Sequence, residues 1–205
     1  MNNYMYLYFL CSLLLLGCGN NKGTKNEPIK TELKATTTFI PDTTLNSKFI
    51  LENYQSIESY FANSNFKLIE QLRSSPVALF SNLTDDEYLL AYQYEGNTKN
   101  SFSCFEIGRF IDLKQINKTS IVNAKVNKFI TESSLQLGQS IEDIKRIKGG
   151  DFKETTEAKE KVITYKIEDA QSDFLKKYSM PSYFLQITFD KTEKARKIIF
   201  GFDYP

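Results

Sequence analysis

The chain has 205 residues, a formal net charge of +1, 22 lysines against 4 arginines, and no histidine. The absence of histidine excludes Ser-His-Asp and Cys-His nucleophile arrangements within one chain and removes the commonest ligand of zinc, copper and non-haem iron sites. The near-neutral charge and the scarcity of arginine argue against a nucleic-acid surface, and no phosphate loop, dinucleotide fingerprint or EF-hand occurs. We therefore expect no nucleic-acid partner, no metal and no other cofactor.

A run of apolar residues from Tyr4 to Leu16 opens the chain, and the first charged side chain is that of Lys22. The run is too short to span a bilayer, which takes about 20 apolar residues, but it has the length of a signal-peptide core. We therefore expect residues 1–17 to be a signal peptide that is removed on export. The alternative interpretation is a short buried strand.

The apolar run ends in Leu15-Leu16-Gly17-Cys18, which resembles the lipobox of bacterial lipoprotein signal peptides. The resemblance implies that a diacylglyceryl group is attached to the sulfur of Cys18, so that the membrane is a partner through this lipid. It also implies a place in the cell envelope. The residues that follow Cys18 lack an acidic run, which favours the outer membrane and its periplasmic side. If the motif is incidental, residues 1–17 are an ordinary signal peptide.

Residues 18–44 are rich in Asn, Lys, Thr and Gly and contain almost no periodic apolar residues. This composition predicts a flexible tether. From Ser47 to Asn63 apolar side chains recur at helical spacing, which predicts an amphipathic helix with Asn46 or Ser47 as its N-cap. The spaced residues are Ile50, Tyr54, Ile57 and Phe61.

Short strand-like segments separated by turn-forming residues follow the predicted helix. They are residues 66–72, 77–81, 88–94 and 102–111. Together with the helix they predict a first helix-plus-sheet unit over residues 45–111. A polar connecting segment over residues 112–134 is expected to carry one strand or one short helix.

The same order of elements recurs over residues 135–205. Ser140 precedes Ile141, Ile144 and Ile147, and Asp143 stands where a capping box needs an acceptor, so a short helix is predicted that ends at Gly149-Gly150. The predicted strands are residues 161–167, 183–189 and 195–202, with a hairpin loop over residues 190–194. The predicted fold class is α+β, an antiparallel sheet backed by short helices, and the recurrence suggests two tandem units.

The second unit resembles two families in its motifs. The motifs are Leu137-Gly138-Gln139-Ser140, Lys148-Gly149-Gly150, the strand KVITYKI and the terminal hairpin FDKTEKARKIIFGF. They are similar to small outer-membrane lipoproteins of the SmpA/OmlA type and to the repeat unit of the β-lactamase inhibitory protein. The resemblance implies an antiparallel sheet backed by helices and a protein-binding role. It transfers no catalytic residue, because the matched positions are turns, caps and core.

Few residues offer chemistry, and each has a structural alternative. Cys104 is expected to be a small core residue and not a nucleophile. Three acidic runs are expected to be turn and helix-start residues, although they are candidates for acid-base catalysis: Asp85-Asp86-Glu87, Glu142-Asp143 and Glu168-Asp169. The strand aromatics are expected to form core, or alternatively a partner-binding face: Tyr88, Tyr92, Tyr94, Tyr165, Tyr183, Phe189, Phe200 and Phe202.

Three functions remain after these exclusions. The leading hypothesis is a non-catalytic, lipid-anchored envelope protein that binds a protein partner or supports an envelope assembly. The alternative is a lipoprotein inhibitor of a secreted hydrolase such as a lysozyme, protease or β-lactamase, with Asn82 to Tyr88 as the inhibitory loop. An enzyme that acts on glycans with carboxylates alone is the third, and it would need two acids about 5 to 10 Å apart in a cleft.

Overall fold

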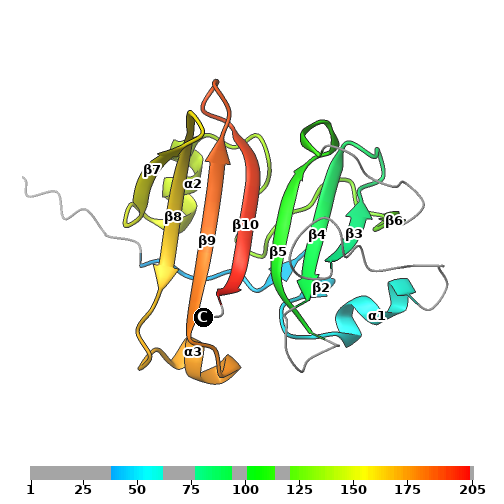
Figure 1. Cartoon of the computed structure of the whole chain (residues 1–205), viewed down its shortest axis with the longest axis horizontal. Helices are drawn as coiled ribbons and strands as arrows, with labels where there is room; N and C mark the ends of the chain where they lie inside the picture. The colour runs from blue at the N-terminus through cyan, green and yellow to red at the C-terminus, as the bar shows by residue number, and fades with distance from the viewer. Residues whose placement is uncertain (1–37, 62–76, 94–100, 114–120, 204–205) are drawn as a thin grey trace, which may run out of the picture. The chain divides into compact units, whose positions relative to one another are not determined.

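The computed structural model describes residues 38–61, 77–93, 101–113 and 121–203, all of which lie in the unit from Ala35 to Pro205. The predicted signal peptide, Cys18, the strand over residues 66–72 and Tyr94 lie outside the described residues. The described residues form an α+β protein, which is a mostly antiparallel, eight-stranded mixed sheet with three short helices (Figure 1). The predicted fold class is confirmed to this extent.

The elements before residue 124 are β1 (Thr44–Leu45), β2 (Phe49–Ile50), α1 (Gln55–Phe61), β3 (Val77–Ser81), β4 (Glu87–Gln93), β5 (Phe102–Arg109), the 3-10 turn η1 (Phe110–Asp112) and β6 (Ile121–Asn123). The later elements are α2 (Ile141–Lys148), β7 (Lys153–Glu157), β8 (Glu160–Ile167), α3 (Asp173–Tyr178), β9 (Ser182–Phe189) and β10 (Ala195–Asp203). Most of the predicted strands are therefore present within two residues of their predicted ends.

The eight strands lie in the order β6-β3-β4-β5-β10-β9-β8-β7. Strands β3 to β6 thus occupy one half of the sheet and β7 to β10 the other, and β5 and β10 join the halves as antiparallel neighbours. The short edge strand β6 pairs in parallel with β3, so the sheet, predicted to be antiparallel, is mostly antiparallel and mixed at this edge. Because β6 has only three residues, its pairing could not be read from alternation.

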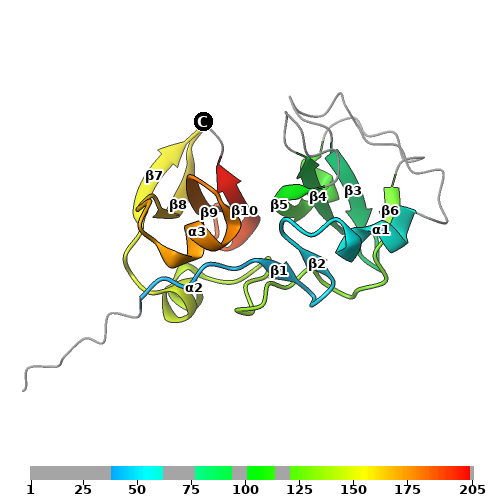
Figure 2. The same ribbon diagram turned by 90° about the horizontal axis from the view of Figure 1, so that it is seen from below.

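One face of the sheet packs against all three helices and holds the main core. Ile57 of α1, Ile144 of α2 and Leu175 of α3 are fully or almost fully buried against it. Figure 2 shows α2 and the β1–β2 hairpin on this face, which we call the helix face. The opposite face, which we call the open face, carries a smaller buried cluster on β3 and β4. Its members are Val77, Leu79, Tyr88 and Leu90.

The two halves differ in how their strands alternate. In β4, Leu89 and Ala91 belong to the main core and Tyr88 and Leu90 to the second cluster, so the strand is apolar on both faces. In β9 the alternate residues Tyr183, Leu185, Ile187 and Phe189 face the core, while Phe184 and Gln186 on the open face are only half-buried. The open face is therefore more accessible over β8 to β10 than over β3 and β4.

The predicted helix over residues 47–63 is wrong at its start. Asn46 and Ser47 have positive φ angles of 51° and 53° and close the β1–β2 hairpin, as the two central residues of a type I′ turn do. Asn46 also accepts a hydrogen bond from the Ile130 amide and donates one to the Lys128 carbonyl, so it has the side-chain bonds of a turn residue and not of an N-cap. The helix begins only at Gln55.

The predicted tether over residues 18–44 also differs from the structure at its end. Phe39 stacks on Tyr165 with ring centroids 4.8 Å apart, and Asp42 is fully buried. Residues 39–51 cross the helix face as an ordered segment, which we call the strap. Composition alone does not predict the strap, because the hydrogen bonds of Asp42 and Asn46 join it to residues 82 to 141 positions away in the chain.

The helix at residues 141–148 is confirmed, and so is its cap. The Ser140 hydroxyl accepts from the Asp143 amide at 3.2 Å, and the Asp143 carboxylate accepts from the Ser140 amide at 3.1 Å. The Ser140 hydroxyl donates to the same carboxylate, and these bonds lower the pKa of Asp143 below its ordinary value. The start of α2 is therefore set locally, as the sequence predicted.

We expect Ser140→Ala to lower the free energy of unfolding by about 1 kcal/mol, because it removes an N-cap acceptor from the helix. Urea unfolding followed by circular dichroism measures the loss. Ser172 is a matched control, since it precedes α3 without a side-chain capping bond, and Ser172→Ala should change stability by much less. Equal losses in the two variants would contradict the role of the capping box.

Candidate functional site

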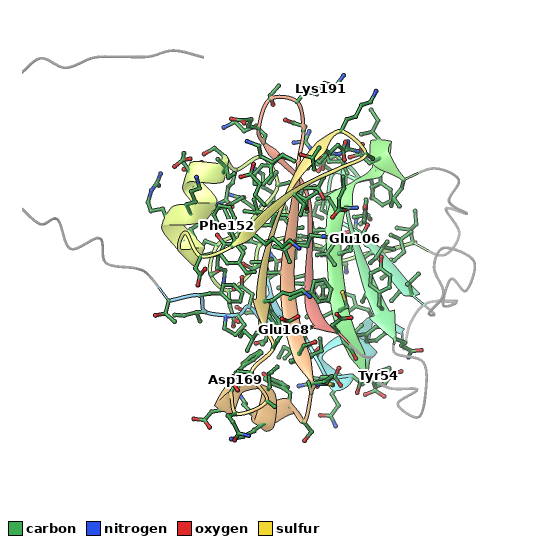
Figure 3. All side chains as sticks on the ribbon, turned by 60° about the vertical axis from the view of Figure 1, so that its left-hand side comes forward. Tyr54, Glu106, Phe152, Glu168, Asp169 and Lys191 are labelled. Carbon is green, nitrogen blue, oxygen red and sulfur yellow. The ribbon has the colours of Figure 1, made fainter. Side chains whose placement is uncertain are left out.

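The three acidic runs named by the sequence do not meet in the structure. Figure 3 places Glu168 and Asp169 at the end of the sheet beside α3, away from Lys191 at the tip of the β9–β10 loop. Glu168 pairs with Lys166 at 2.9 Å, and Asp169 accepts from the Gln171 amide in a turn. Each side chain therefore has a local structural partner.

The run at Glu142 and Asp143 belongs to the first turn of α2. Asp143 closes the capping box, and Glu142 pairs with Lys145 at 3.1 Å on the exposed side of the helix. Carboxylates in a first helical turn are stabilised by the helix dipole. The structure gives this pair the role of a helix start.

The loop that contains Asp85 and Asp86 is held by the side chain of Asn82. Its amide nitrogen donates to Asp86 at 2.7 Å and to the Asn127 carbonyl at 2.9 Å, and its oxygen accepts from the Asp86 amide. Hydrogen bonds from Thr84 and Asn82 lower the pKa of Asp86 below its ordinary value. Leu83 at the loop tip is 52% exposed, so the loop is a rigid turn with an apolar tip.

Glu87 follows this loop and is buried, with only 5% of its surface exposed. Its carboxylate accepts a hydrogen bond from the Phe129 amide at 3.0 Å, which fastens the segment before α2 to β4. Burial raises the pKa of Glu87 above its ordinary value, and the Phe129 amide opposes the rise. Glu87 therefore holds two segments together, but its ionised carboxylate is destabilised by burial near neutral pH.

We expect Glu87→Gln to raise the free energy of unfolding near neutral pH. An acid whose pKa rises on folding contributes stability that is fully present below its unfolded pKa and is lost as the pH rises through the folded pKa. Urea unfolding of both proteins near pH 7 and about pH 5 measures this, and the advantage of the variant should shrink at the lower pH. A variant that is less stable than wild type near pH 7 would contradict the expectation.

Cys104 was predicted to be a core residue, and this prediction is wrong. Its thiol is half-exposed on the open face, and the next residue, Phe105, faces the core instead. Opposite Cys104 on β10 stands Gly201, where an added Cβ would overlap the Ser103 carbonyl oxygen and lie 2.5 Å from the Cys104 Cα. The close contact of β5 and β10 at this point therefore requires a glycine.

The strand aromatics are core residues, as predicted, with one exception among those described. Five of them are buried in the main core: Tyr165, Tyr183, Phe189, Phe200 and Phe202. Tyr88 is buried in the cluster on the open face, and Tyr92 is only half-buried there. Burial raises the pKa of Tyr165 to about 12, and its hydroxyl donates to the Gly149 carbonyl at 2.7 Å. The aromatics therefore mainly build the core.

The structure brings together a different carboxylate, that of Glu106 on β5. It is 2% exposed, and its two oxygens accept hydrogen bonds from Tyr88 at 2.8 Å and Tyr92 at 2.7 Å. Gly108 makes this possible, because an added Cβ there would overlap the Tyr88 ring. Two tyrosine hydroxyls thus hold a buried carboxylate in one orientation, as buried charges require.

Arg196 on β10 links both halves of the sheet beside Glu106. Its guanidinium donates to Asp112 of η1 at 2.8 Å and to Glu160 of β8. The side chains of all three residues are about two-thirds buried, with 30–35% of their surface exposed. The N–H donors of a guanidinium lie in one plane and point in fixed directions. The two carboxylates therefore hold the Arg196 side chain in one orientation.

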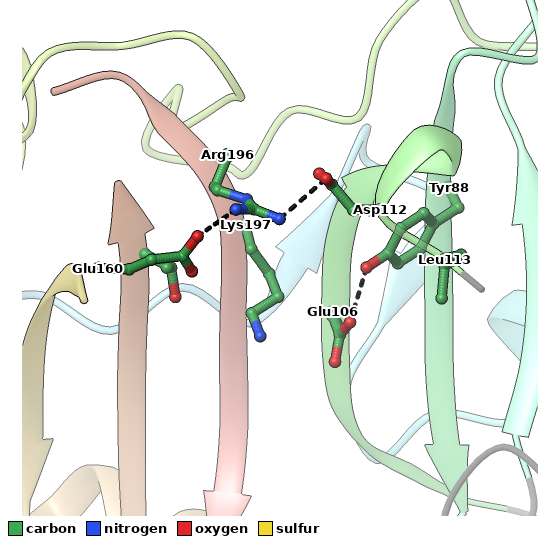
Figure 4. A pocket seen from close by; sticks show the side chains of 8 residues that line it. Tyr88, Glu106, Asp112, Leu113, Glu160, Arg196 and Lys197 are labelled. Atoms are coloured by element: carbon green, nitrogen blue, oxygen red, sulfur yellow. Dashed lines mark hydrogen bonds and ion pairs between the residues drawn. The ribbon is translucent and has the colours of Figure 1, made fainter. Parts of the chain in front are cut away.

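These residues line a pocket of about 130 Å³ on the open face, where β5 meets β10. Figure 4 shows Arg196 between Asp112 and Glu160, with the Tyr88 hydroxyl pointing to Glu106. Lys197 and Thr188 line the same pocket. We call it the junction pocket. Its three carboxylates come from different elements and are each engaged by hydrogen bonds or ion pairs, so the polar lining of the pocket has a fixed geometry.

A second pocket, of about 230 Å³, shares Asp112 and Arg196 with the first and opens at the end of the sheet. Its other lining residues come from the end of β5, the loop before α2 and the β9–β10 hairpin. They are Arg109, Ile111, Gly138, Asp190, Lys194 and Ala195. Ile111 is 89% exposed, which is the largest exposure of a big apolar side chain among the described residues. We call this the rim pocket.

Sequence reasoning missed both pockets. The stronger of two available signals was a single acid, Glu106, within the apolar strand Phe102–Arg109, since a lone carboxylate in such a strand needs a partner. Arg196 gave a weaker signal, being one of only 4 arginines. Neither signal indicates which residues lie opposite, because β10 follows β5 by almost 90 positions.

A pair of opposite charges is fully buried on the helix face. Lys148 at the end of α2 lies 2.8 Å from the Asp42 carboxylate in the strap, and the two side chains are 1% and 0% exposed. Ser133 donates to Asp42 from both its amide and its hydroxyl, and Tyr183 donates to the Asp42 carbonyl. Burial lowers the pKa of Lys148, while the Asp42 carboxylate opposes this. The pair fastens the strap to the second half of the sheet.

Two features are absent from the described residues. No group of three or more Cys, Asp or Glu side chains in that part of the chain has the arrangement of a metal site. No helix among the same residues is long and apolar enough to cross a membrane.

Comparison with known proteins found no similarity. No protein-family model matches the chain, no curated protein is similar to it, and no solved structure matches its fold.

Proposed function

We propose that this protein is a non-catalytic, lipid-anchored envelope protein whose folded body binds a protein partner. The observation that carries the proposal is the pair of pockets where β5 meets β10. Tyr88 and Tyr92 fix the carboxylate of Glu106 in the junction pocket, and Arg196 fixes that of Asp112, which lines both pockets. The rim pocket adds an isoleucine, Ile111, that is 89% exposed. Preorganised polar groups around an exposed apolar side chain are typical of recognition surfaces.

We further propose that the body consists of two tandem helix-then-sheet units, as the resemblance to the β-lactamase inhibitory protein and to SmpA/OmlA-type lipoproteins implies. The strand order supports this, because β3 to β5 and β8 to β10 occupy separate halves. A short helix precedes the strands of each half, α1 in the first and α2 in the second. In this arrangement the recognition site lies between the units, at the place where their sheets join.

The anchor and the location in the envelope are part of the proposal. We expect Cys18→Ala to abolish incorporation of labelled palmitate and to release the protein from the membrane fraction, because the lipid provides the membrane contact. Mass spectrometry of the mature protein should find a lipid-modified N-terminal cysteine. Cys104→Ala is the matched control and should leave both labelling and fractionation unchanged. Retention of the label in Cys18→Ala would contradict the anchor.

The binding function is tested in envelopes that contain the full lipidated chain. Chemical crosslinking followed by affinity purification should return the same protein partner repeatedly. The crosslink should weaken when Arg196 is replaced by Met, a residue of comparable length without the guanidinium charge. Repeated failure to return any specific partner would overturn the proposal.

A second candidate is an inhibitor of a secreted hydrolase, with the loop from Asn82 to Tyr88 entering the cleft of the enzyme. The observation that favours it is the rigidity of the loop, in which Asn82 fixes the backbone while Leu83 projects into solvent. A preformed loop loses little entropy on binding. Assay of the full chain against a panel of lysozymes, proteases and β-lactamases tests this candidate. Inhibition should depend on Leu83, and no inhibition across the panel would remove it.

A further inference from the structure

We infer that the rim pocket is the docking site for an acidic segment of the partner protein, with a carboxylate bound between Arg109 and Lys194 and an apolar residue packed on Ile111. This inference rests on the proposed binding function and specifies the chemistry of the partner. It follows from which donors and acceptors of the rim pocket already have partners.

The two carboxylates that line the rim pocket are engaged within the protein. One oxygen of Asp190 accepts hydrogen bonds from the Thr192 amide, the Thr192 hydroxyl and the Lys194 amide, which closes the β9–β10 loop. These bonds lower the pKa of Asp190, so the group stays ionised. Asp112 is bound to Arg196 at 2.8 Å. Neither carboxylate is the main feature that the pocket offers to a ligand.

The cations of the rim pocket are in the opposite situation. Within the described residues, the side chains of Arg109 and Lys194 make no hydrogen bond or ion pair, whereas Arg196 is bound by two carboxylates. Asp86, Glu87 and Asp190 lie near enough to Arg109 to interact with its charge, but none of them forms an ion pair with it. The side-chain donors of Arg109 and Lys194 are therefore left to bind a ligand, and two cationic donors complement a carboxylate.

Ile111 supplies the apolar part of the same surface. It stands on η1, which is fastened to the neighbouring loop by a hydrogen bond from the Phe110 amide to the Asp86 carbonyl at 3.1 Å. A side chain of this size that is 89% exposed on a fixed turn favours binding when a partner covers it, because its apolar surface is then removed from water. An acidic residue flanked by an apolar one fits both features, and the partner needs no other special chemistry.

The test uses photocrosslinking in the full, lipidated chain in envelopes. A benzophenone amino acid replaces Ile111, and the matched control places it at Ile40, which is 71% exposed in the strap on the helix face. A third position, Phe184 on the open face, reports on partner binding away from the rim. The crosslinked partner segment is identified by mass spectrometry.

The expected result is a protein crosslink at position 111, absent at position 40, whose partner segment contains Asp or Glu within a few residues of an apolar side chain. Arg109→Glu and Lys194→Glu should each reduce this crosslink about tenfold or more, because like charges then face each other. Lys159→Glu, on the exposed turn between β7 and β8, is the matched charge control and should leave it unchanged.

Other outcomes overturn the inference. A crosslink at position 111 to lipid, glycan, a second copy of the chain or a segment without carboxylates would do so, as would insensitivity to both charge reversals. A protein crosslink confined to position 184 would overturn the rim site and leave the proposed binding function standing. No protein crosslink at any of the three positions would overturn both.

Discussion

Replacing Lys148 with methionine should lower the free energy of unfolding by about 3–5 kcal/mol, the range found when one partner of a buried ion pair is removed. The substitution leaves the Asp42 carboxylate at 0% exposure without its counter-ion. It also removes the donor to the Ile40 carbonyl. Because a small domain has a total stability of about 5–15 kcal/mol, a loss of this size is readily measured by urea unfolding.

Two further variants show whether the lost stability comes from the unpaired charge. Asp42→Asn combined with Lys148→Met removes both charges but keeps an acceptor for Ser133, so it should be more stable than Lys148→Met alone. Lys145→Ala, on the same helix, removes an exposed ion pair with Glu142 and a cation–π contact with the Phe152 ring, and it should cost about 1 kcal/mol. If Lys148→Met costs no more than Lys145→Ala, the buried pair does not fasten the strap.

Replacing Gly201 with alanine should lower the free energy of unfolding by about 2–4 kcal/mol, combining overpacking with backbone strain. The φ angle of Gly201 is +154°, and an added Cβ would overlap the Ser103 carbonyl oxygen on β5. To make room for the Cβ, β5 and β10 must move apart at this point. The effect on stability is large because, in the described residues, these two strands form the only ladder between the two halves of the sheet.

Cys104 reports on the separation directly, because it stands opposite Gly201. In Gly201→Ala its half-exposed thiol should react faster with a thiol reagent than in wild type. Gly150→Ala is the matched control, since an added Cβ at Gly150 meets nothing within 4 Å. Unchanged stability and unchanged thiol reactivity in Gly201→Ala would contradict the close contact of β5 and β10.

The local elements that the sequence predicted well are those whose signals lie within a few residues. Strand β3 has the predicted ends, Val77 and Ser81, because turn-forming residues bound a short apolar run. Helix α2 has its predicted cap because Ser140 and Asp143 are three residues apart. In both cases neighbouring residues alone determine the structure.

The elements that it missed lack such a signal or carry a misleading one. Strand β7 reads KETTE and is polar on both faces, so only its pairing with β8 makes it a strand. Asn and Ser are common both as N-caps of helices and in hairpin turns, so Asn46 and Ser47 fit either structure. The hydrogen bonds between the Asn46 side chain and the backbone of Lys128 and Ile130 stabilise the turn. Tertiary contacts overrode local preference at these positions.

The sequence by itself determined the α+β class, the apolar faces of most strands and the capped helix at Ser140, because these depend on periodicity and on side chains close along the chain. Only the tertiary structure decided that β5 lies beside β10, that Arg196 reaches Asp112 and that Lys148 pairs with Asp42. Contacts between residues about 80 to 110 positions apart depend on strand order and register, which no local pattern encodes. The candidate site consists of such contacts, and for that reason its residues could not be found before the fold was known.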